Sequence, residues 1–204
     1  MTQGKLFIIS APSGAGKTSL VKQLATHTQD LIVSISHTTR PMRPGEVEGQ
    51  DYFFVTHDDF SAMLKRQAFL EYAEVYDNFY GTTLQSVEIS LNNGQDVILE
   101  IDWQGAELVK KILPHSVAIF IFPPSIAVLQ ERLLARGQDS TAVIARRMRN
   151  AIAEMQHYPS FDYLIVNDDF QRAFLEIQSI IHVYRLTRER QQQNLQALLA
   201  NLLT

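Results

Sequence analysis

The sequence lacks cysteine altogether among its 204 residues, which excludes disulfide bonds and thiolate metal sites. It also lacks any run of about 18 apolar residues, the length that a membrane-spanning helix needs. The strongly apolar segment 117–122 ends at Pro123-Pro124, and the short apolar segment after Lys5 is not a signal-peptide core. We therefore expect a cytoplasmic protein that has no membrane partner.

An excess of positive charge is missing as well. The formal net charge is −4, which argues against a nucleic-acid polymer as partner. Yet five arginines and no lysine lie between Arg132 and Arg149, and arginine is the residue suited to gripping phosphate with two parallel hydrogen bonds. The charge pattern indicates a small anionic ligand that is bound locally.

Apolar segments of strand length alternate with segments of helical spacing along most of the chain. The predicted strands of this pattern lie at residues 5–10, 31–36, 96–101, 116–122 and 163–166. The predicted helices lie at residues 18–26, 83–92, 104–112, 125–137 and 140–155. This alternation predicts an α/β fold in which helices cover both faces of a parallel sheet.

Residues 37–82 break the alternation. A loop with two Pro and two Gly is predicted at residues 37–50, with short strands at residues 52–55 and 69–76. Thr56 followed by Asp59 is a capping box for a helix that reaches about Gln67. The segment is predicted to be an inserted, β-rich section.

A phosphate-binding loop is the most specific motif. It follows a predicted strand and opens a predicted helix, and it matches G-x-x-x-x-G-K-[ST] at every fixed position but the first, where an alanine is tolerable if its φ is negative. Small residues let backbone N–H groups converge on phosphate oxygens, the lysine adds charge at the β/γ-phosphates, and the threonine offers a hydroxyl to Mg²⁺. A turn that binds nothing is the less favoured alternative. The predicted nucleoside triphosphate site comprises Ala11, Pro12, Ser13, Gly14, Ala15, Gly16, Lys17 and Thr18.

Two further features are weaker by themselves. The strand at residues 96–101 leads into Glu100 and Asp102, acids that would lie near the metal or acceptor if this strand neighbours the loop. Arg40 and Arg43, three residues apart, could clamp a phosphate, although composition alone favours a solvated basic loop.

The segment 36–54 resembles the acceptor block SxTTRxxRxGExxGxDYxF of the guanylate kinases, and it meets every fixed position. The resemblance spans about residues 5–190, and its further motifs are Glu71, NFYGT at 78–82, LEIDWQGA at 99–106, FPPS at 122–125 and VNDD at 166–169. It implies transfer of the γ-phosphoryl group of ATP to GMP, with Mg²⁺ as cofactor. It also implies one P-loop NTPase-type domain with a core (about 1–35, 95–125 and 160–190), a GMP-binding region (about 36–90), a helical lid (about 126–158) and a C-terminal helix extension (about 190–204).

The resemblance also implies residue roles. The GMP phosphate would be held by Ser36, Arg40, Arg43, Tyr52 and Tyr80, and the guanine by or near Glu71, Thr82, Glu100 and Asp102. Lid and hinge arginines that close over the transferring phosphate would be Arg132, Arg136 and Arg147, and adenine contacts would be Asn167 and Asp168. Guanine offers two adjacent donors that a carboxylate accepts together, while Thr82 can donate to O6. Adenine offers no such pair, so a site around Glu71 should reject AMP.

Three matters stay open from the sequence. A guanylate-kinase-like scaffold module is an alternative, but Lys17-Thr18, the acceptor arginines and a chain of 204 residues favour the enzyme. Glu100 stands where some relatives have Asp, which leaves its detailed contact undecided. At the C-terminus a helix break is expected near Arg190, and the second half of the helix either packs on the domain or forms an oligomer contact. The heptad positions there are Phe174, Ile177, Ile181, Tyr184, Leu195, Leu198 and Leu202.

Overall fold

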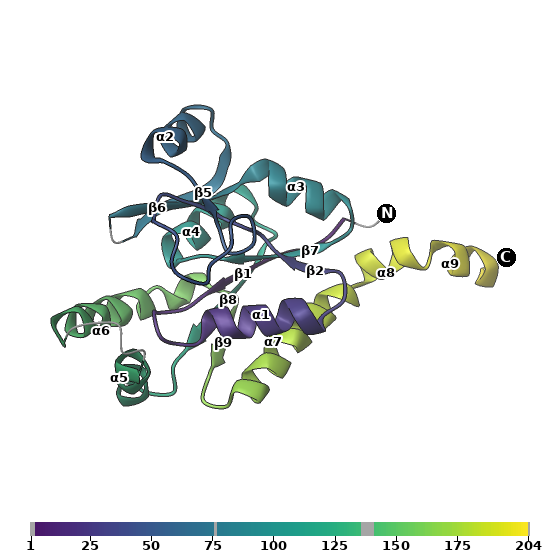
Figure 1. The fold of residues 1–204 in the computed structure, drawn as a ribbon. Helices are drawn as coiled ribbons and strands as arrows, with labels where there is room; N and C mark the ends of the chain where they lie inside the picture. Colours follow the sequence, from purple (N-terminus) through teal and green to yellow (C-terminus); the bar gives the residue numbers. More distant parts are fainter. Residues whose placement is uncertain (1–2, 76, 136–140, 204) are drawn as a thin grey trace.

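The central sheet has five parallel strands (Figure 1), in the order β2-β7-β1-β8-β9. The structure is a computed structural model that describes residues 3–75, 77–135 and 141–203. The predicted parallel sheet is confirmed. Its strands are β1 (Leu6–Ser10), β2 (Leu31–Val33), β7 (Asp96–Glu100), β8 (Val117–Phe122) and β9 (Tyr163–Val166).

The three inner strands β1, β7 and β8 bury both of their faces, which explains their unbroken apolar runs, whereas the edge strand β9 exposes Leu164 and Val166. On β1, Phe7 and Ile9 belong to a core with helices α1 (Lys17–His27) and α7 (Phe170–Arg185), whereas Leu6 and Ile8 point to the opposite core. The second core is closed by helices α3 (Leu84–Asn92) and α4 (Trp103–Ile112). The strand period of two thus divides one apolar run between two layers.

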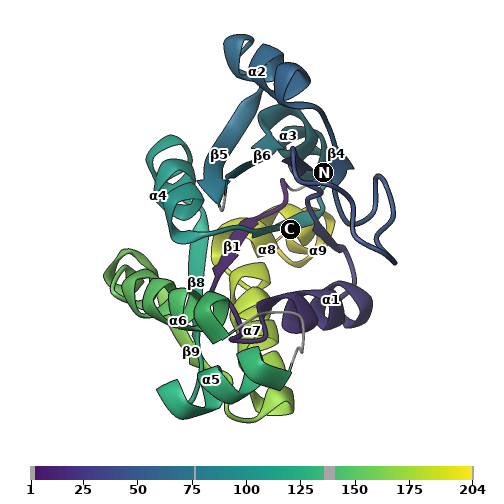
Figure 2. The same cartoon turned by 60° about the vertical axis from the view of Figure 1, so that its left-hand side comes forward.

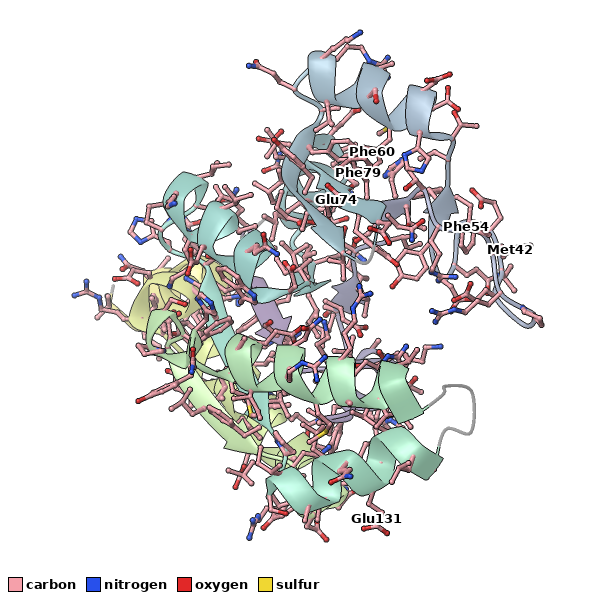
Figure 3. The ribbon with its side chains drawn as sticks, turned by 90° about the vertical axis from the view of Figure 1, so that its left-hand side faces the viewer. Met42, Phe54, Phe60, Glu74, Phe79 and Glu131 are labelled. Carbon is pink, nitrogen blue, oxygen red and sulfur yellow. The ribbon has the colours of Figure 1, made fainter. Side chains whose placement is uncertain are left out.

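A second sheet has the strand order β4-β3-β6-β5 (upper part of Figure 3). Its strands are β3 (His37–Thr38), β4 (Phe53–Phe54), β5 (Phe69–Val75) and β6 (Asn78–Thr83), and helix α2 (His57–Lys65) packs beside it. Phe60 of α2 stacks on Phe69 at 4.4 Å and on Phe79 at 5.4 Å between ring centroids. Thr56 caps α2 by accepting a hydrogen bond from the Asp59 N–H, so the predicted capping box is confirmed.

The sequence-based assignment is wrong at three places here. Strand β3 lies within residues 37–50, which were predicted to be a loop, because β4 and β6 supply its pairing partners. Strand β2 ends at Val33 rather than at residue 36, because the chain leaves the central sheet and pairs His37 with Gly81 in the second one. Strand β6 was not predicted, since it mixes Asn78 and Gly81 with threonines and has no apolar alternation.

Helices α5 (Ile126–Ala135) and α6 (Thr141–Met155) form a unit with its own small apolar cluster (Figure 2). Leu129 and Leu133 of α5 meet Ile144 and Ala151 of α6 in this cluster. The Ser125 hydroxyl accepts a hydrogen bond from the Val128 N–H at 3.2 Å, as a helix cap does. The predicted start of the second helix at Ser140 lies outside the described residues.

After α6 the chain returns to the main body through the short helix η1 (Tyr158–Ser160). The His157 ring stacks on the Trp103 ring at 3.4 Å between centroids. This contact ties the end of α6 to the first residue of α4, directly beside the end of β7.

The C-terminal region breaks earlier than predicted. Helix α8 (Arg188–Asn194) starts directly after Thr187 and is followed by α9 (Gln196–Leu202). The break therefore lies at 186–187 rather than near Arg190. Phe174, Ile177 and Ile181 are buried as expected. Beyond the break α8 and α9 run away from the domain (Figure 1), and Leu202 is 69% exposed. An oligomer contact of this extension stays a prediction.

None of the helices in the described part of the chain is both long and apolar enough to cross a membrane.

Asp96 joins the C-terminal segment to the sheet. Its side chain is fully buried, and it forms ion pairs with Arg185 at 2.8 Å and Arg190 at 2.7 Å. It also accepts the backbone N–H of Lys5 at 2.7 Å. One carboxylate therefore neutralises two arginines on either side of the break between α7 and α8.

We expect Asp96→Asn to lower the free energy of unfolding by roughly 3 kcal/mol, because two partly buried arginines lose their counter-charge. Urea denaturation would measure the loss. Glu189→Gln is a suitable control, since the nearby Arg188–Glu189 pair is more than four-fifths exposed and such pairs add little. Equal stability of the two variants would contradict this role of Asp96.

Candidate active site

A cavity of about 330 Å³ lies at the carboxyl ends of strands β1 and β7. In an open parallel sheet this edge is where ligands bind. The chain reverses its direction of winding here, because β7 and β8 lie on opposite sides of β1. The predicted site residues that line the cavity are Ala11, Pro12, Ser13, Gly14, Gly16, Lys17, Thr18, Ser36, Arg43, Tyr52, Glu71, Tyr80, Glu100, Asp102 and Arg147.

The glycines of the phosphate loop are required by its shape. Gly14 and Gly16 have φ angles of 93° and 94°, a backbone conformation that residues with a side chain rarely adopt. A Cβ atom on Gly16 would lie 2.4 Å from the Asn167 side-chain nitrogen. Ala11 is not among the described residues with positive φ, so the condition for an alanine at the first position of the loop is met.

Arg132 and Asn167 hold the loop from behind. Asn167 is buried, and its Nδ2 donates to the backbone oxygen of Ala15 at 2.7 Å. Arg132 Nη2 donates to the backbone oxygen of Asn167 at 3.0 Å. Asp168 instead lies at the surface, paired with Arg172. The predicted contacts of these residues with ATP stay predictions, and the geometry gives Arg132 and Asn167 a second role as supports of the loop.

Lys17 and Thr18 reach across to the end of β7. Lys17 Nζ donates to the backbone oxygen of Ile101 at 3.1 Å, and Thr18 Oγ1 donates to Glu100 Oε1 at 2.5 Å. Because β1 and β7 are neighbouring parallel strands with Ile9 opposite Glu100, the loop after one strand meets the acids after the other. The sequence predicted this juxtaposition conditionally, and the sheet order confirms it.

Glu71 is the most deeply buried acid of the cavity, with 3% of its surface exposed. Thr82 is fully buried opposite Glu71 on the paired strand β6. A Cβ atom on Gly105 of α4 would lie 2.6 Å from Glu71 Oε2, so only glycine leaves room there. Burial raises the Glu71 pKa from its usual value near 4.5 to about 7, and the polar groups of the neighbouring Thr82 oppose this rise.

The two acceptor arginines are placed differently. Arg43 lines the cavity. The Arg40 guanidinium is held by Glu46, with Nη2–Oε1 at 2.8 Å and Nη1–Oε2 at 3.0 Å, and it lies over the Tyr52 ring. The hydrogen bond from Arg40 keeps the pKa of Glu46 below its usual range. Arg40 therefore already has an anionic partner inside the protein.

Two tyrosines and a serine complete this part of the cavity. The rings of Tyr52 and Tyr80 meet edge to face at 5.9 Å between centroids. Burial raises the pKa of Tyr52 to about 12, so its hydroxyl is a hydrogen-bond donor at any ordinary pH. Ser36 Oγ lies 3.0 Å from Thr82 Oγ1, which links the arginine end of the cavity to the Glu71 end.

Comparison with known proteins identifies the family. The guanylate kinase family model matches residues 3–184. The chain is 57% identical over 203 residues to the guanylate kinase of Methylococcus capsulatus and 54% identical over 206 residues to that of Escherichia coli, covering 100% and 99% of those proteins. The chain belongs to the guanylate kinase family. Its fold is similar to the crystal structure of guanylate kinase from Anaplasma phagocytophilum, with a TM-score of 0.76 and 32% identity over 93% of this chain and 90% of the other.

Three residues of this guanylate kinase fold were not singled out as site residues from the sequence. Gly105 makes room for Glu71, and Glu46 holds Arg40. Glu154, on α6, lines the cavity beside the phosphate loop, and burial raises its pKa to about 7. Glu46 lies in the acceptor block 36–54 and Gly105 in the motif at 99–106, so the family resemblance could have identified both as candidates. Nothing in the local sequence marks Glu154, which lies more than 130 residues along the chain from the loop with which it shares the cavity. The predicted lid arginine Arg136 lies outside the described residues.

We expect the buried Glu71 carboxyl to make stability depend on pH. Its pKa is higher in the folded than in the unfolded protein, so between about pH 4.5 and pH 7 the folded state binds more protons. Stability must then fall as the pH rises through this window, by about 1.4 kcal/mol for each unit of pKa difference. Urea denaturation at pH 5 and pH 8 should show that Glu71→Gln removes this part of the loss.

Glu74→Gln is the matched control, because Glu74 is exposed on the same strand (Figure 3). Contributions from other acids, including Glu154, are the same in both variants. A Glu71→Gln protein with the same pH dependence as Glu74→Gln would show that Glu71 is ionised and well solvated in the folded state.

Proposed function

We propose that the protein transfers the γ-phosphoryl group of ATP to GMP and releases ADP and GDP. The single observation that carries this proposal is the buried Glu71 carboxylate in the same cavity as an intact phosphate-binding loop. The loop accounts for a phosphoryl donor, and the buried acid accounts for the choice of acceptor base. The site roles of individual residues are part of the proposal.

The donor half is the loop between β1 and α1. Its backbone N–H groups and the start of α1 favour the phosphates of ATP. Lys17, now bonded to the backbone oxygen of Ile101, would turn its ammonium to the β/γ-phosphates. Arg132 and Asn167 keep the loop in place from behind, and Asn167 and Asp168 would meet the adenine.

The oxygen atoms around Thr18 suit Mg²⁺. The Thr18 hydroxyl and the Glu100 carboxylate are hard oxygen ligands that already lie together. Among the described residues no group of three or more His, Cys, Asp or Glu could form a protein metal cage. This agrees with the usual habit of Mg²⁺, which binds one or two protein oxygens, the nucleotide phosphates and water. We propose Thr18 as its protein ligand, with Glu100 beside it. A bound Mg²⁺ would neutralise charge that develops on the phosphates.

In the acceptor half, guanine would be recognised by a buried negative charge that accepts hydrogen bonds from the base. The Glu71 carboxylate can accept the adjacent N1–H and exocyclic amine of guanine, which satisfy a buried anion. Adenine would leave this anion unpaired, and such a loss commonly amounts to a discrimination of about 10⁴-fold. Thr82 lies opposite Glu71 in the β5–β6 pair, so we propose that it orients this carboxylate first and contacts the base second. Asp102 lines the same cavity.

The acceptor phosphate would lie among Ser36, Arg43, Tyr52 and Tyr80. Arg40 would bind this phosphate either in place of Glu46 or together with it. Phosphoryl transfer depends on positioning and on positive charge rather than on a covalent intermediate. Arg147 of α6 lines the cavity from the opposite side, so it can approach the transferring group. We assign Lys17, Arg40, Arg43, Arg136 and Arg147 to this charge stabilisation. We place the reaction in the cytoplasm, in the recycling of GMP.

A guanylate-kinase-like scaffold module is the competing function. Two observations favour the enzyme. The phosphate loop has the shape that phosphate binding needs, including Gly14 and Gly16 with positive φ. The relatives that match across the full chain at 54–57% identity are called guanylate kinases.

The acceptor proposal is tested by ADP release with ATP, Mg²⁺ and a panel of nucleoside monophosphates. We expect GMP to exceed AMP by at least about 10³-fold in kcat/KM. Glu71→Gln should raise the KM for GMP by at least about tenfold and leave the KM for ATP nearly unchanged, because a buried charge-assisted hydrogen bond is lost. Glu74→Gln on the exposed face of the same strand serves as control. Equal turnover of AMP and GMP would refute the assignment.

The donor proposal is tested by Lys17→Met. We expect kcat to fall by about 10²- to 10³-fold, the range found when one preorganised charge contact to a transition state is removed. The thermal midpoint should change little, since Lys17 is only half-buried at the first turn of α1. Lys111→Met, at an exposed position of α4, is the control. Near-normal turnover by Lys17→Met would show that the loop does not hold the transferred phosphate.

A further inference from the structure

Helix α6 carries residues that line the cavity, yet it belongs to neither of the two main cores. Arg147 and Glu154 lie about two turns apart on one face of α6, and both line the cavity. An adjacent face of α6 packs on α5 in a separate apolar cluster (Figure 2). The described members of this cluster belong to these two helices alone, and they are Leu129, Leu133, Ile144, Met148 and Ala151. The position of Arg147 therefore depends on how this pair of helices is attached to the rest of the protein.

The first attachment is α5, which lies against the phosphate loop. Arg132 of α5 donates to the backbone oxygen of Ala15 at 3.4 Å, and a Cβ atom on Gly14 would lie 3.0 Å from Leu129 Cδ1. The apolar contacts between α5 and α6 are non-directional. They keep the two helices together, but they do not by themselves fix the angle at which α6 meets the cavity.

The second attachment is a ring stack just after the end of α6. The His157 ring lies on the Trp103 ring with 3.4 Å between centroids and 11° between planes. Stacked rings have a specific geometry, which aliphatic contacts lack. His157 Nδ1 also lies 3.6 Å from Glu107 Oε1, one turn further along α4, where the two form an ion pair only when His157 is protonated. Both rings are half-buried, so the stack orients α6 from outside the main cores.

Trp103 is the fixed partner of the stack. It is the first residue of α4, and Asp102 caps this helix by accepting the Gly105 N–H at 2.9 Å. Ala106 and Val109 of α4 are buried in one of the two main cores. Trp103 therefore belongs to the main body of the protein, and it directly follows a residue that lines the cavity.

The backbone of His157 belongs to the elements on both sides of it. Its N–H donates to the backbone oxygen of Glu154 in the last turn of α6 at 3.2 Å, and its backbone oxygen accepts the Ser160 N–H of η1 at 3.2 Å. A displacement of the His157 ring is therefore transmitted to α6. Arg147 lies about 15 Å from this end at the rise of an α-helix, so a tilt of about 4° moves Arg147 by about 1 Å.

We propose that His157 is a positioning residue for phosphoryl transfer: its stack on Trp103 fixes the end of α6 and so holds Arg147 at the transferring phosphate. His157 is not among the described residues that line the cavity, so it acts through Arg147 rather than by contact with a substrate. This inference rests on the proposed function, because Arg147 has its assigned role only if phosphate is transferred in this cavity.

The test is steady-state kinetics of the full chain with ATP, Mg²⁺ and GMP. His157→Ala should lower kcat by about 10- to 100-fold, since a misplacement of about 1 Å costs up to about 100-fold. The KM values for ATP and GMP should stay within about threefold, because the residues proposed to bind the two nucleotides are unchanged. His157→Phe restores a flat ring and should recover kcat to within about threefold of the unaltered protein. His115→Ala, at an exposed position shortly after α4, is the matched control.

Two further variants separate the stack from other effects at this place. Trp103→Leu removes the stack from its other side and should reproduce the loss of kcat, which keeps the test decisive if His157→Ala folds poorly. Glu107→Gln removes only the half-exposed ion pair and should leave kcat within about twofold, because such pairs contribute little. A loss of kcat in Glu107→Gln as large as that in His157→Ala would show that the ion pair, and not the stack, holds α6.

A double-mutant cycle with Arg147→Met distinguishes positioning from general support of the fold. Arg147→Met should lower kcat by itself, and adding His157→Ala should then lower kcat by less than about threefold more, because the group to be positioned is already gone. The same full loss with and without Arg147 would overturn the inference. So would an unchanged kcat in His157→Ala, or a His157→Phe protein as impaired as His157→Ala.

The failure of the inference can be told apart from failure of the proposed function. If the unaltered protein does not phosphorylate GMP, the proposed function is wrong, and the inference falls with it. If Arg147→Met keeps full kcat, the role assigned to Arg147 is wrong, and the inference falls as well. If the unaltered protein is active and Arg147→Met is impaired while His157→Ala is normal, only the positioning role of His157 is wrong.

Discussion

The ammonium group of Lys17 is the cation around which the ligand-free cavity is organised. It bonds to the end of β7 through the backbone oxygen of Ile101, and it lowers the pKa of both Glu71 and Glu154 against the effect of their burial. A cavity that must receive two anionic nucleotides would be expected to contain more cations than acids. Here the lining contains four acids, Glu71, Glu100, Asp102 and Glu154, and the charge of Lys17 favours the ionised form of two of them, Glu71 and Glu154.

The parallel sheet is what makes this arrangement possible. Because β1 and β7 are neighbours in parallel register, the loop that carries Lys17 and the acids that follow β7 end at one edge. The second sheet brings Glu71 to the same cavity from a different direction, on strand β5. Helix α6 adds a third wall. Three separate parts of the chain therefore contribute charges to one small volume.

The sequence predicts those parts of the molecule whose physical cause is local. The phosphate loop is one, because its glycines, lysine and threonine lie within eight consecutive residues. Its strand and helix neighbours are others, because each carries its own periodicity. Strand β6 is not predicted, since its partners β3 and β5 supply the pairing that its own residues do not encode. The sequence places the break between α7 and α8 too late, near Arg190 instead of at 186–187. The end of α7 depends on long-range contacts, namely the burial of Phe174, Ile177 and Ile181 and the Arg185–Asp96 ion pair. Glu154 is also missed, because only the fold brings it to the cavity that the phosphate loop lines, at the other end of the chain.

One phosphate-binding group of the site already has an anionic partner inside the protein. The Arg40 guanidinium is held by Glu46 through two hydrogen bonds. This internal carboxylate satisfies a charge that would otherwise be left without its anion, and an unsatisfied charge in a partly buried place is costly. In the proposed function, a substrate phosphate would take the place of the Glu46 carboxylate on Arg40. Such an exchange lowers the net gain from binding, but it keeps the guanidinium oriented before the substrate arrives. Glu71 has the opposite proposed role, since it is a buried anion that would receive its hydrogen-bond donors from guanine. On these proposed roles, the phosphate replaces an anion of the protein, whereas guanine supplies donors to one, and only the second step distinguishes one base from another.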